Sequence, residues 1–403
     1  MAEADPTAVV RNVGGGEVQR VRPQRRRNQV PEDILGDAQL AAAIASLPSN
    51  YNLEVHKTVW KVRQAAAKGP ITVALQMPEG LLMFACIISD IIRQFTGCDS
   101  VIMADVTYGA CCVDDFTAEK LGAQFLVHYG HSCLVPIHVT KIPVLYVFVE
   151  IQFEVAHLCE VIRRNFNKHD KIVLLGTIQF TNMAFGVFEA LRADFPGLSM
   201  SQAKPLSTGE TLGCTSPVLA RDTTALVFIA DGRFHLEAVL IQNPWVNAFR
   251  YDPYSKQMTR ESYDISTMRA SRWQAIELAR RCTVFGLVLG TLGRQGSTGI
   301  FDHLRSILEK EGKVVLPFLM AEINLNKLRS IPKVEAWVQV ACPRLSIDWS
   351  NAFDKPLLTP YEIEVALGCA EWKEQYPMDY YRADGGAWSN RANRDRVFPN
   401  PQL

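Results

Sequence analysis

Three cysteines that follow small residues are the side chains of this sequence best suited to joint chemistry. Cys111 follows alanine in GACC, Cys214 follows glycine in LGCT, and Cys342 follows alanine in VACP. Small residues let other groups approach the backbone closely. Thiolates that converge repel one another, and a metal resolves the repulsion by accepting their charge. The three thiols therefore predict either a zinc site or an iron–sulfur cluster with one open iron. No CxxC or CxxxCxxC motif decides between the two.

Cys111 and Cys112 are adjacent, and only one of them is expected to bind the metal. Successive side chains of a strand point to opposite faces, so neighbouring cysteines cannot both face one centre without distortion. An alignment of the three cysteine motifs places Cys112 opposite Thr215 and Pro343, neither of which binds metals. We predict that Cys111 is the ligand and that Cys112 is a small packing residue behind it.

The elements that must position these cysteines form an internal repeat. Three segments share a short β-branched strand, a turn and an amphipathic helix. Their strands are expected near Val73–Leu75, Ile172–Leu175 and Phe285–Leu289. The third helix shows its apolar face most clearly, through Ile300, Leu304, Ile307 and Leu308. A period of roughly 100 residues suits a small α/β domain rather than a solenoid.

Strand–helix alternation predicts parallel sheets with right-handed crossovers. Functional groups in such sheets gather beyond the carboxyl ends of the strands. We therefore expect three similar small parallel-sheet α/β domains around a pseudo-threefold centre, where the three cysteines meet. The third repeat departs from the other two, because PRLSIDW follows its cysteine and no equivalent strand is visible. The expected divisions are an extension over 1–48, domains over 49–155, 156–264 and 265–380, and a tail over 381–403.

Three further motifs leave two interpretations open. GTLGRQG, residues 290–296, lacks the dinucleotide fingerprint, but it follows a strand and opens a helix. Its amides could hold a carboxylate or phosphate, or it could be a tight turn. HYGHSC could supply extra ligands or structural hydrogen bonds, and DGRFH could orient a polar substrate or form a buried salt bridge. Their candidate side chains are His128, His131, Cys133, Asp231, Arg233 and His235.

Composition narrows the classes of protein. The chain has 403 residues, 48% hydrophobic and 21% charged, with 42 basic and 42 acidic side chains. A net charge of zero argues against a global electrostatic grip on nucleic acid or an anionic membrane. No apolar run approaches the roughly 18 residues of a membrane helix, and no secretory signal is visible. Ten irregularly spaced cysteines predict a reducing compartment, the cytoplasm.

The first 48 residues are expected to be mostly disordered, because they are rich in Gly, Pro and Gln and carry five arginines between Arg20 and Arg27. This stretch is either a contact arm for a nucleic-acid-associated partner or a solvated tail. PEDILGDAQLAAAIASLPSN, at its end, has helical periodicity and is expected to dock onto the body.

Long motifs spread over roughly residues 45–380 resemble the diphthamide synthase family, and within it the first chain of the eukaryotic heterodimer. They are LPSNYN, ALQMPEGLL, DVTYGACCVDDFTA, HYGHSCL, LGCTSP, DGRFHLE, YDPYSK, LGTLGRQG and QVACPRLSIDW. The resemblance implies a 4Fe–4S cluster held by Cys111, Cys214 and Cys342, with S-adenosylmethionine on the open iron. The reduced cluster of the family cleaves the sulfonium to a 3-amino-3-carboxypropyl radical. This radical adds to the imidazole C2 of a histidine in translation elongation factor 2, the first step of diphthamide formation.

The resemblance also implies that the cluster and S-adenosylmethionine carry the chemistry and that no side chain is catalytic. It implies partners as well. The partners are a homologous second subunit, elongation factor 2, and a small metal-binding electron carrier with a reductase. As holders of the methionine carboxylate we assign Gly290, Gly293, Arg294 and Gly296. Two alternatives remain: a zinc-dependent transferase with a three-cysteine site, and a non-catalytic scaffold subunit.

Overall fold

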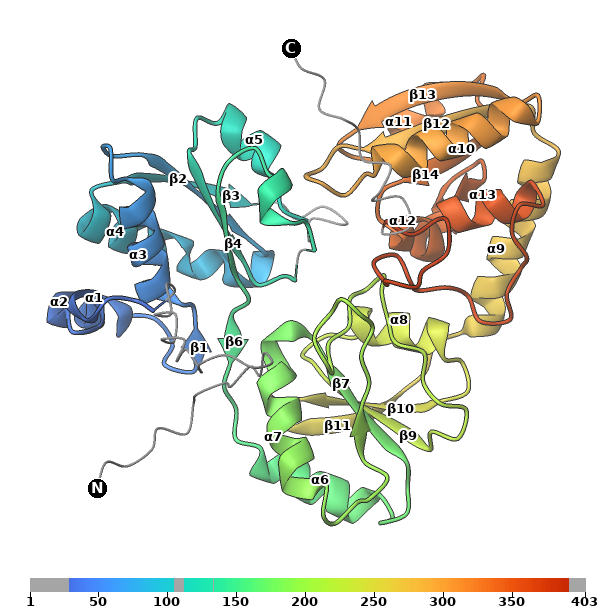
Figure 1. Ribbon diagram of the computed structural model, residues 1–403. Helices are drawn as coiled ribbons and strands as arrows, with labels where there is room; N and C mark the ends of the chain where they lie inside the picture. The colour runs from blue at the N-terminus through green and yellow to red at the C-terminus, as the bar shows by residue number, and fades with distance from the viewer. Residues whose placement is uncertain (1–28, 105–111, 133, 391–403) are drawn as a thin grey trace, which may run out of the picture.

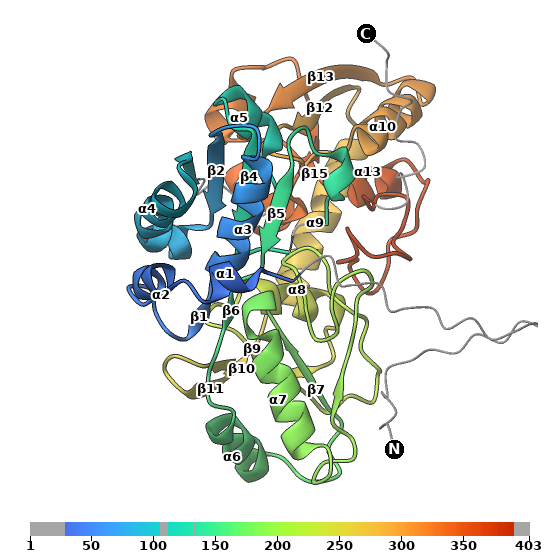
Figure 2. The same ribbon diagram turned by 60° about the vertical axis from the view of Figure 1, so that its left-hand side comes forward.

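Three separate lobes, each built on one sheet, make up the structure (Figures 1 and 2). The computed structural model describes residues 29–104, 112–132 and 134–390. Cys111 and Cys133 lie outside these residues, as do the first 28 and the last 13 positions. The mixed α/β class with several parallel sheets, expected from the repeat, is confirmed.

The first lobe has a four-stranded parallel sheet. Its strands, in spatial order, are β3 (Asp99–Ala104), β2 (Thr72–Met77), β4 (Phe125–Tyr129) and β5 (Val144–Val147). Its helices are α1 (Glu32–Leu35), α2 (Ala38–Ile44), α3 (Val55–Ala65), η1 (Glu79–Phe84), α4 (Ala85–Thr96), α5 (Asp115–Lys120) and η2 (Ile137–Val139). The main core packs α3 and α4 against one face of the sheet, and Ala118 of α5 packs on the other.

The second lobe has a five-stranded sheet, parallel except for one edge strand. Its strands are β8 (Ser199–Met200), β7 (Ile172–Gly176), β9 (Ala225–Ile229), β10 (Asn247–Asp252) and the antiparallel β11 (Gln257–Glu261). Its helices are α6 (Ala156–Asn165), η3 (Ile178–Phe180), α7 (Thr181–Leu191) and α8 (Phe234–Gln242). Helices α6 and α7 cover one face, and α8 covers the other.

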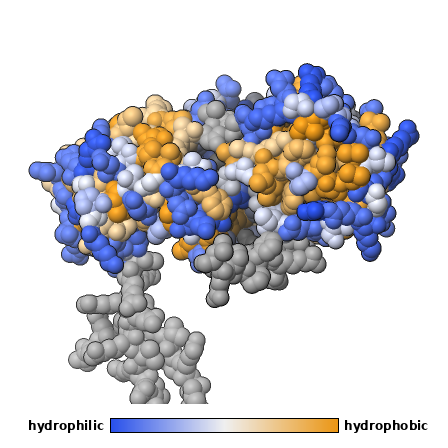
Figure 3. Space-filling model, turned by 90° about the horizontal axis from the view of Figure 1, so that it is seen from above, coloured by the Kyte–Doolittle hydropathy of each residue, from blue (hydrophilic) through white to orange (hydrophobic). Residues whose placement is uncertain are grey.

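The third lobe again has a four-stranded parallel sheet. Its strands are β13 (Val314–Met320), β12 (Val284–Gly290), β14 (Ala336–Val340) and β15 (Leu357–Leu358). Its helices are α9 (Ile265–Arg280), α10 (Thr298–Lys310), α11 (Leu325–Arg329), α12 (Pro343–Trp349), η4 (Ser350–Ala352) and α13 (Pro360–Ala366). Val314 and Leu319 of the edge strand β13 are exposed. Figure 3 shows hydrophobic surface over this lobe, on the right.

All three sheets share one strand order: the second strand of the lobe, then the first, the third and the fourth. The first strands are β2, β7 and β12, at the positions expected from the repeat. Each is a nearly continuous apolar run, as expected for strands covered by helices on both faces. A small antiparallel pair of β1 (Tyr51–Asn52) and β6 (Glu150–Ile151) lies where the chain passes between the first two lobes.

The third cysteine occupies a different place in its lobe from the one that the repeat predicts. Cys214 lies between the second and third strands of its lobe, and Cys111 has the same place in the sequence of the first. Cys342 instead comes directly after β14, the third strand. The alignment of all three cysteines therefore does not hold at Cys342, which explains why no equivalent strand follows it. It still lies beyond a strand's carboxyl end, where functional groups gather.

Segments near both ends pack onto the lobes. Ile34 of α1 and Leu40 of α2 are buried against the first lobe, as expected for this stretch. Trp388 is buried in the third lobe and donates a hydrogen bond to Asp379 at 2.8 Å. The chain up to Ser389 is thus part of the body, although its polar composition predicts a tail. Within the described residues, no helix has the length and apolar character needed to cross a membrane.

Candidate metal centre

Cys214 lies at the tip of a tight turn. Leu212 and Thr215 form an antiparallel bridge, with amide-to-carbonyl distances of 2.9 and 3.3 Å, so Gly213 and Cys214 are the two residues between them. A Cβ on Gly213 would lie 2.1 Å from the ring of Phe234, which only glycine avoids. The close approach of Phe234 therefore explains the small residue before this cysteine.

A segment near the C-terminus, residues 378–381, holds this turn in place, and we call this segment the strap. Thr215 bridges Asp379, the amide of Ser216 donates to the carbonyl of Met378 at 2.9 Å, and the amide of Tyr381 donates to Thr215 Oγ1 at 3.0 Å. Sequence reasoning missed this strap, because a polar stretch carries no local signal for pairing with a turn 166 residues away. The strap belongs to the surroundings of Cys214.

Cys342 is the N-cap residue of α12, directly after the buried strand β14. Pro343 occupies the first turn, where the absence of an N–H costs nothing. The side chain of Gln339 donates to the carbonyl of Cys342 at 2.8 Å and contacts Ser346 Oγ at 3.0 Å, which fixes the backbone. Cys342 also lines a cavity of ≈ 200 Å³ together with Gly290.

Cys112 is buried, and its Sγ lies 3.4 Å from the hydroxyl of Tyr381 on the strap. Its carbonyl accepts a hydrogen bond from Gln76 at 2.9 Å, and Gln76 also accepts from the amide of Asp114 at 3.0 Å. This buried network ties Cys112 and Asp114 to the end of β2. The predicted ligand Cys111 lies outside the described residues, so its selection over Cys112 stays a prediction.

The thiols of three lobes share one electrostatic neighbourhood. Burial raises the pKa of Cys214 most, and the thiols of Cys342 and Cys112 raise it further. Burial also raises the pKa of Cys342 to about 11. Thiols are ligands of both zinc and iron–sulfur clusters, so the chemistry of Cys214 and Cys342 fits either kind of centre. Among the described residues, no group of three His, Cys, Asp or Glu side chains is arranged to hold a metal ion.

Arg344 is the buried cation of this neighbourhood. Its guanidinium donates to the carbonyls of Gly213 at 3.3 Å and of Phe234 at 2.7 Å, and it lies 4.1 Å from the ring centre of Phe234. It also pairs with Glu237 at 2.6 Å and Asp348 at 3.0 Å. Arg344 thus joins the Cys214 turn of the second lobe to the Cys342 helix of the third, and its charge lowers the pKa of both thiols.

The glycine-rich loop docks the third lobe onto the first. The amide of Arg294 donates to the carbonyl of Val113 at 3.1 Å, and its guanidinium pairs with Asp115. Gly293 has a φ of +55°, and a Cβ there would lie 2.8 Å from the same carbonyl. Of the four residues assigned to the cofactor, Gly290 lines the cavity beside Cys342 and Gly296 packs against the Gly290 carbonyl. The other two lie at the junction between lobes.

The two histidine-containing motifs meet between the first and second lobes. Burial lowers the pKa of His235 to about 3, and the charge of His131 adds to this lowering. His128 is buried against Gln76, with Nδ1 2.9 Å from Oε1, which is the structural alternative for this residue. Arg233 pairs with Glu237 at 2.8 Å and Glu261 at 3.5 Å on a half-exposed surface.

Known proteins share this architecture and sequence. The family model for diphthamide synthesis proteins matches residues 77–377. The chain belongs to the diphthamide synthase family. The 2-(3-amino-3-carboxypropyl)histidine synthase subunit 1 of Bos taurus is 53% identical over 380 residues, which are 94% of this chain and 86% of that protein. Subunit 1 of Dictyostelium discoideum is 50% identical over 370 residues, 90% of this chain and 78% of that protein.

A solved structure of this family carries a cluster. Dph2 from Pyrococcus horikoshii with a 4Fe-4S cluster has a TM-score of 0.66 and 25% identity, covering 81% of this chain and 93% of that one. The chain is accordingly a transferase of diphthamide biosynthesis, as its relatives' names state. Their designation as subunit 1 implies further subunits in their pathway.

Proposed function

We propose that this chain carries out the first step of diphthamide biosynthesis as a non-standard radical S-adenosylmethionine enzyme. It transfers a 3-amino-3-carboxypropyl group to the imidazole C2 of a histidine in translation elongation factor 2. The observation that carries the proposal is the hydrogen bond from Arg344, two residues after Cys342, to the carbonyl of Gly213, the residue before Cys214, because it joins the cysteine segments of two lobes. Family membership and a relative with a 4Fe-4S cluster support it.

The ligands that we propose for a 4Fe–4S cluster are Cys111, Cys214 and Cys342, one from each lobe. The chemistry that such a cluster supplies when bound is one-electron reduction of the S-adenosylmethionine sulfonium. The protein's own part is positional: Gly213 admits Phe234, the strap holds the Cys214 turn, and Arg344 ties that turn to α12. The common strand order of the three sheets supports a pseudo-threefold arrangement around this centre.

The cavity beside Cys342 is our proposed site for the amino acid end of S-adenosylmethionine. It lies beyond the ends of β12, β13 and β14, where ligands of parallel sheets bind, and Gly290 lines it. Its volume of ≈ 200 Å³ suits one end of that molecule better than the whole. Gly293, Arg294 and Gly296 shape the adjoining loop. The amide of Arg294 donates to the carbonyl of Val113, so we propose the amides of Gly293 and Gly296 for contact with the carboxylate.

We further propose a homologous second subunit as partner, an external electron carrier with a reductase, and a reducing, cytoplasmic setting. The designation of the relatives as subunit 1 supports the second subunit, and the cysteine usage supports the reducing setting. Turnover by this chain alone would contradict the proposal of a second subunit.

Anaerobic purification followed by a transfer assay tests the proposal. A brown protein that absorbs near about 400 nm, is bleached by dithionite and labels elongation factor 2 from S-adenosylmethionine is the expected result. A colourless protein with stoichiometric zinc supports a zinc-dependent transferase instead. A colourless, folded, metal-free protein supports a scaffold subunit.

A further inference from the structure

Two buried glutamines hold the backbone of cysteine segments in two different lobes. Gln76 is 7% exposed, and Gln339 has no exposed surface. Each is the last residue but one of an inner strand, β2 or β14, whose other buried residues are apolar. A polar side chain in such a place costs free energy unless its groups find partners. The partners therefore indicate what each glutamine does.

The side-chain amide of each glutamine donates to the backbone carbonyl of a cysteine. Gln76 Nε2 lies 2.9 Å from the carbonyl oxygen of Cys112, and Gln339 Nε2 lies 2.8 Å from that of Cys342. A carbonyl only accepts hydrogen bonds, so the atom that faces it is the amide nitrogen in both cases. The bond joins residues 36 apart in the first lobe and 3 apart in the third, so the two arrangements are not copies of one local motif.

The oxygen of Gln339 shows that its nitrogen is the part that matters. Oε1 is buried and has no hydrogen-bond partner among the described residues, whereas Nε2 also contacts Ser346 Oγ on α12 at 3.0 Å. A buried acceptor that stays unsatisfied costs stability, so packing alone would favour an apolar residue here. The bonds to Cys342 and Ser346 are what a glutamine adds at this position.

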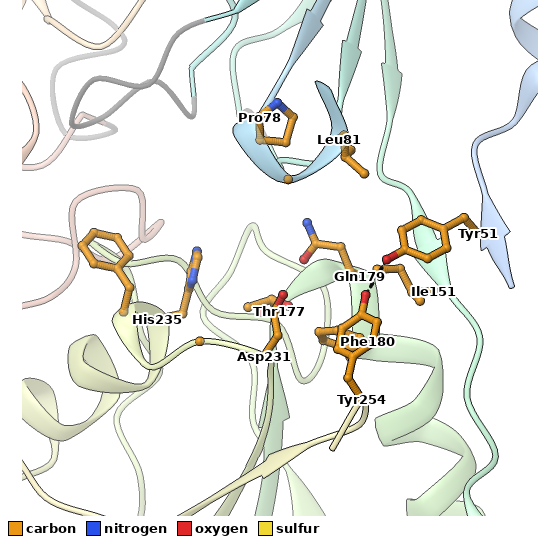
Figure 4. A pocket seen from close by; sticks show the side chains of 13 residues that line it. Tyr51, Pro78, Leu81, Ile151, Thr177, Gln179, Phe180, Asp231, His235 and Tyr254 are labelled. Atoms are coloured by element: carbon orange, nitrogen blue, oxygen red, sulfur yellow. Dashed lines mark hydrogen bonds between the residues drawn. The ribbon is translucent and has the colours of Figure 1, made fainter. Parts of the chain in front are cut away.

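Ligand binding in a neighbouring cavity does not explain either glutamine. A cavity of ≈ 200 Å³ between the first and second lobes is lined by Pro78 and Leu81, which follow Gln76 in the chain (Figure 4). Gln76 is not among the described residues that line this cavity. Gln339 is likewise not among those that line the cavity beside Cys342. Both side chains are directed to the backbone instead.

The second lobe holds the carbonyl of its cysteine with a different donor. The backbone amide of Tyr380, on the strap, lies 3.4 Å from the carbonyl oxygen of Cys214. The cysteine carbonyls described in the three lobes thus each accept a hydrogen bond, two of them from glutamine side chains. A peptide unit is planar, so a held carbonyl fixes the orientation of the whole unit and restricts the residue that carries it.

We propose that Gln76 and Gln339 are positioning residues of the metal centre, which hold the backbone beside the proposed ligands Cys111 and Cys342 before the metal binds. This inference rests on the proposed function. Gln339 acts on a proposed ligand itself, and Gln76 acts on Cys112, the residue next to one. Partners that orient the ligands of a metal typically change its affinity by roughly 10–100-fold when they are removed.

Loss of the cluster to an iron chelator tests the inference in the full chain, purified anaerobically. Gln76→Met and Gln339→Met keep the length of the side chain but remove the donor. Each should speed the loss of the roughly 400 nm absorbance about tenfold and alter the electron paramagnetic resonance signal of the dithionite-reduced cluster. Ser346→Ala removes only the second acceptor of Gln339, so its rate should stay near that of the unmodified protein.

Tyr361→Phe is the matched control for a general loss of stability. Tyr361 is 1% exposed, and its hydroxyl bonds the carbonyl of Glu371 at 3.1 Å and the amide of Lys373 at 2.8 Å, after α13. The variant should lower the urea midpoint without changing the rate of cluster loss. Equal acceleration in Tyr361→Phe, or none in either glutamine variant, overturns the inference. If Gln339→Met does not fold, Gln76→Met decides it.

The metal of the unmodified protein separates this inference from the proposed function. If the protein holds zinc instead of a cluster, the proposed function fails, and the same variants are compared by their rates of zinc release. Faster release from both glutamine variants but not from Tyr361→Phe then supports the positioning role, and equal release contradicts it. A folded, metal-free unmodified protein overturns both.

Discussion

Arg294 of the glycine-rich loop donates two hydrogen bonds to the carboxylate of Asp115, from Nε at 2.6 Å and from Nη2 at 2.7 Å, across the junction of the third and first lobes. The Asp115 side chain has no exposed surface, and the amide of Lys141 donates to it at 2.5 Å. This ion pair gives Arg294 a structural role that its place in a ligand-binding motif does not predict.

Breaking this pair should weaken the junction between the lobes. Asp115→Asn leaves the Arg294 charge without its partner, and such changes in buried pairs cost roughly 3–5 kcal/mol. We expect a loss of about 3 kcal/mol in the free energy of unfolding, since Arg294 keeps some exposure, measured by urea denaturation. Glu160→Gln, which breaks the exposed pair with Arg164, is the control and should cost less than about 1 kcal/mol. Equal losses in both variants contradict the prediction.

The same pair predicts an acid dependence. Burial raises the pKa of Asp115, but the hydrogen bonds from Arg294 and Lys141 and the Arg294 charge outweigh it, so the net pKa lies below the ordinary 3.8. A lowered carboxyl pKa stabilises the fold above pH 3.8, and the contribution is lost as the pH falls through the folded value. The difference in the free energy of unfolding between the unmodified protein and Asp115→Asn should therefore shrink in urea titrations at strongly acidic pH. A difference independent of pH excludes this linkage.

Cys111→Ala should abolish the roughly 400 nm absorbance and the transfer reaction, whereas Cys112→Ala should leave both largely in place. The reason is that adjacent side chains cannot both reach one centre without distortion. Cys112 lies against Tyr381, so its truncation should cost stability rather than iron. Iron analysis and absorption spectra of both anaerobically purified variants decide the matter. If only Cys112→Ala loses iron, the ligand is Cys112 and the prediction is wrong.

Arg344→Met should lower iron retention and stability together. The substitution keeps much of the side-chain volume but removes the hydrogen bonds to the carbonyls of Gly213 and Phe234. It also leaves Glu237 and Asp348 without their shared cation, at an expected cost of roughly 3–5 kcal/mol. Iron content after desalting and urea denaturation measure the two effects. Arg305→Met on the exposed face of α10 is the control, and an equal loss there contradicts the assignment.

His235 should destabilise the fold as the solution becomes mildly acidic. Its folded pKa of about 3 lies below the ordinary 6.5, so the unfolded chain binds more protons between these values. The stability associated with the neutral ring is complete above pH 6.5 and is lost as the pH falls toward 3. The free energy of unfolding should drop between pH 8 and pH 5 by less in His235→Gln than in the unmodified chain. Identical drops argue against a neutral ring in the folded chain.

Local pattern in the sequence determined the three strand–helix repeats and their parallel sheets. The apolar runs at β2, β7 and β12 and the spaced apolar face of α10 depend on neighbours a few residues away, so composition and periodicity reveal them. The chemical character of Cys214 and Cys342 followed from the same reasoning, since a small residue before a cysteine implies close approach to the backbone. Family resemblance then supplied the expectation of a cluster and of the reaction.

Tertiary structure alone decided which distant groups meet. Arg294 and Asp115 are 179 residues apart, and Cys112 and Tyr381 are 269 apart. The place of Cys342 after the third strand of its lobe, and the burial of Trp388, were equally invisible in local pattern. These contacts form because lobes pack by shape and charge across their surfaces, and the energy of such packing depends on three-dimensional approach rather than on spacing along the chain.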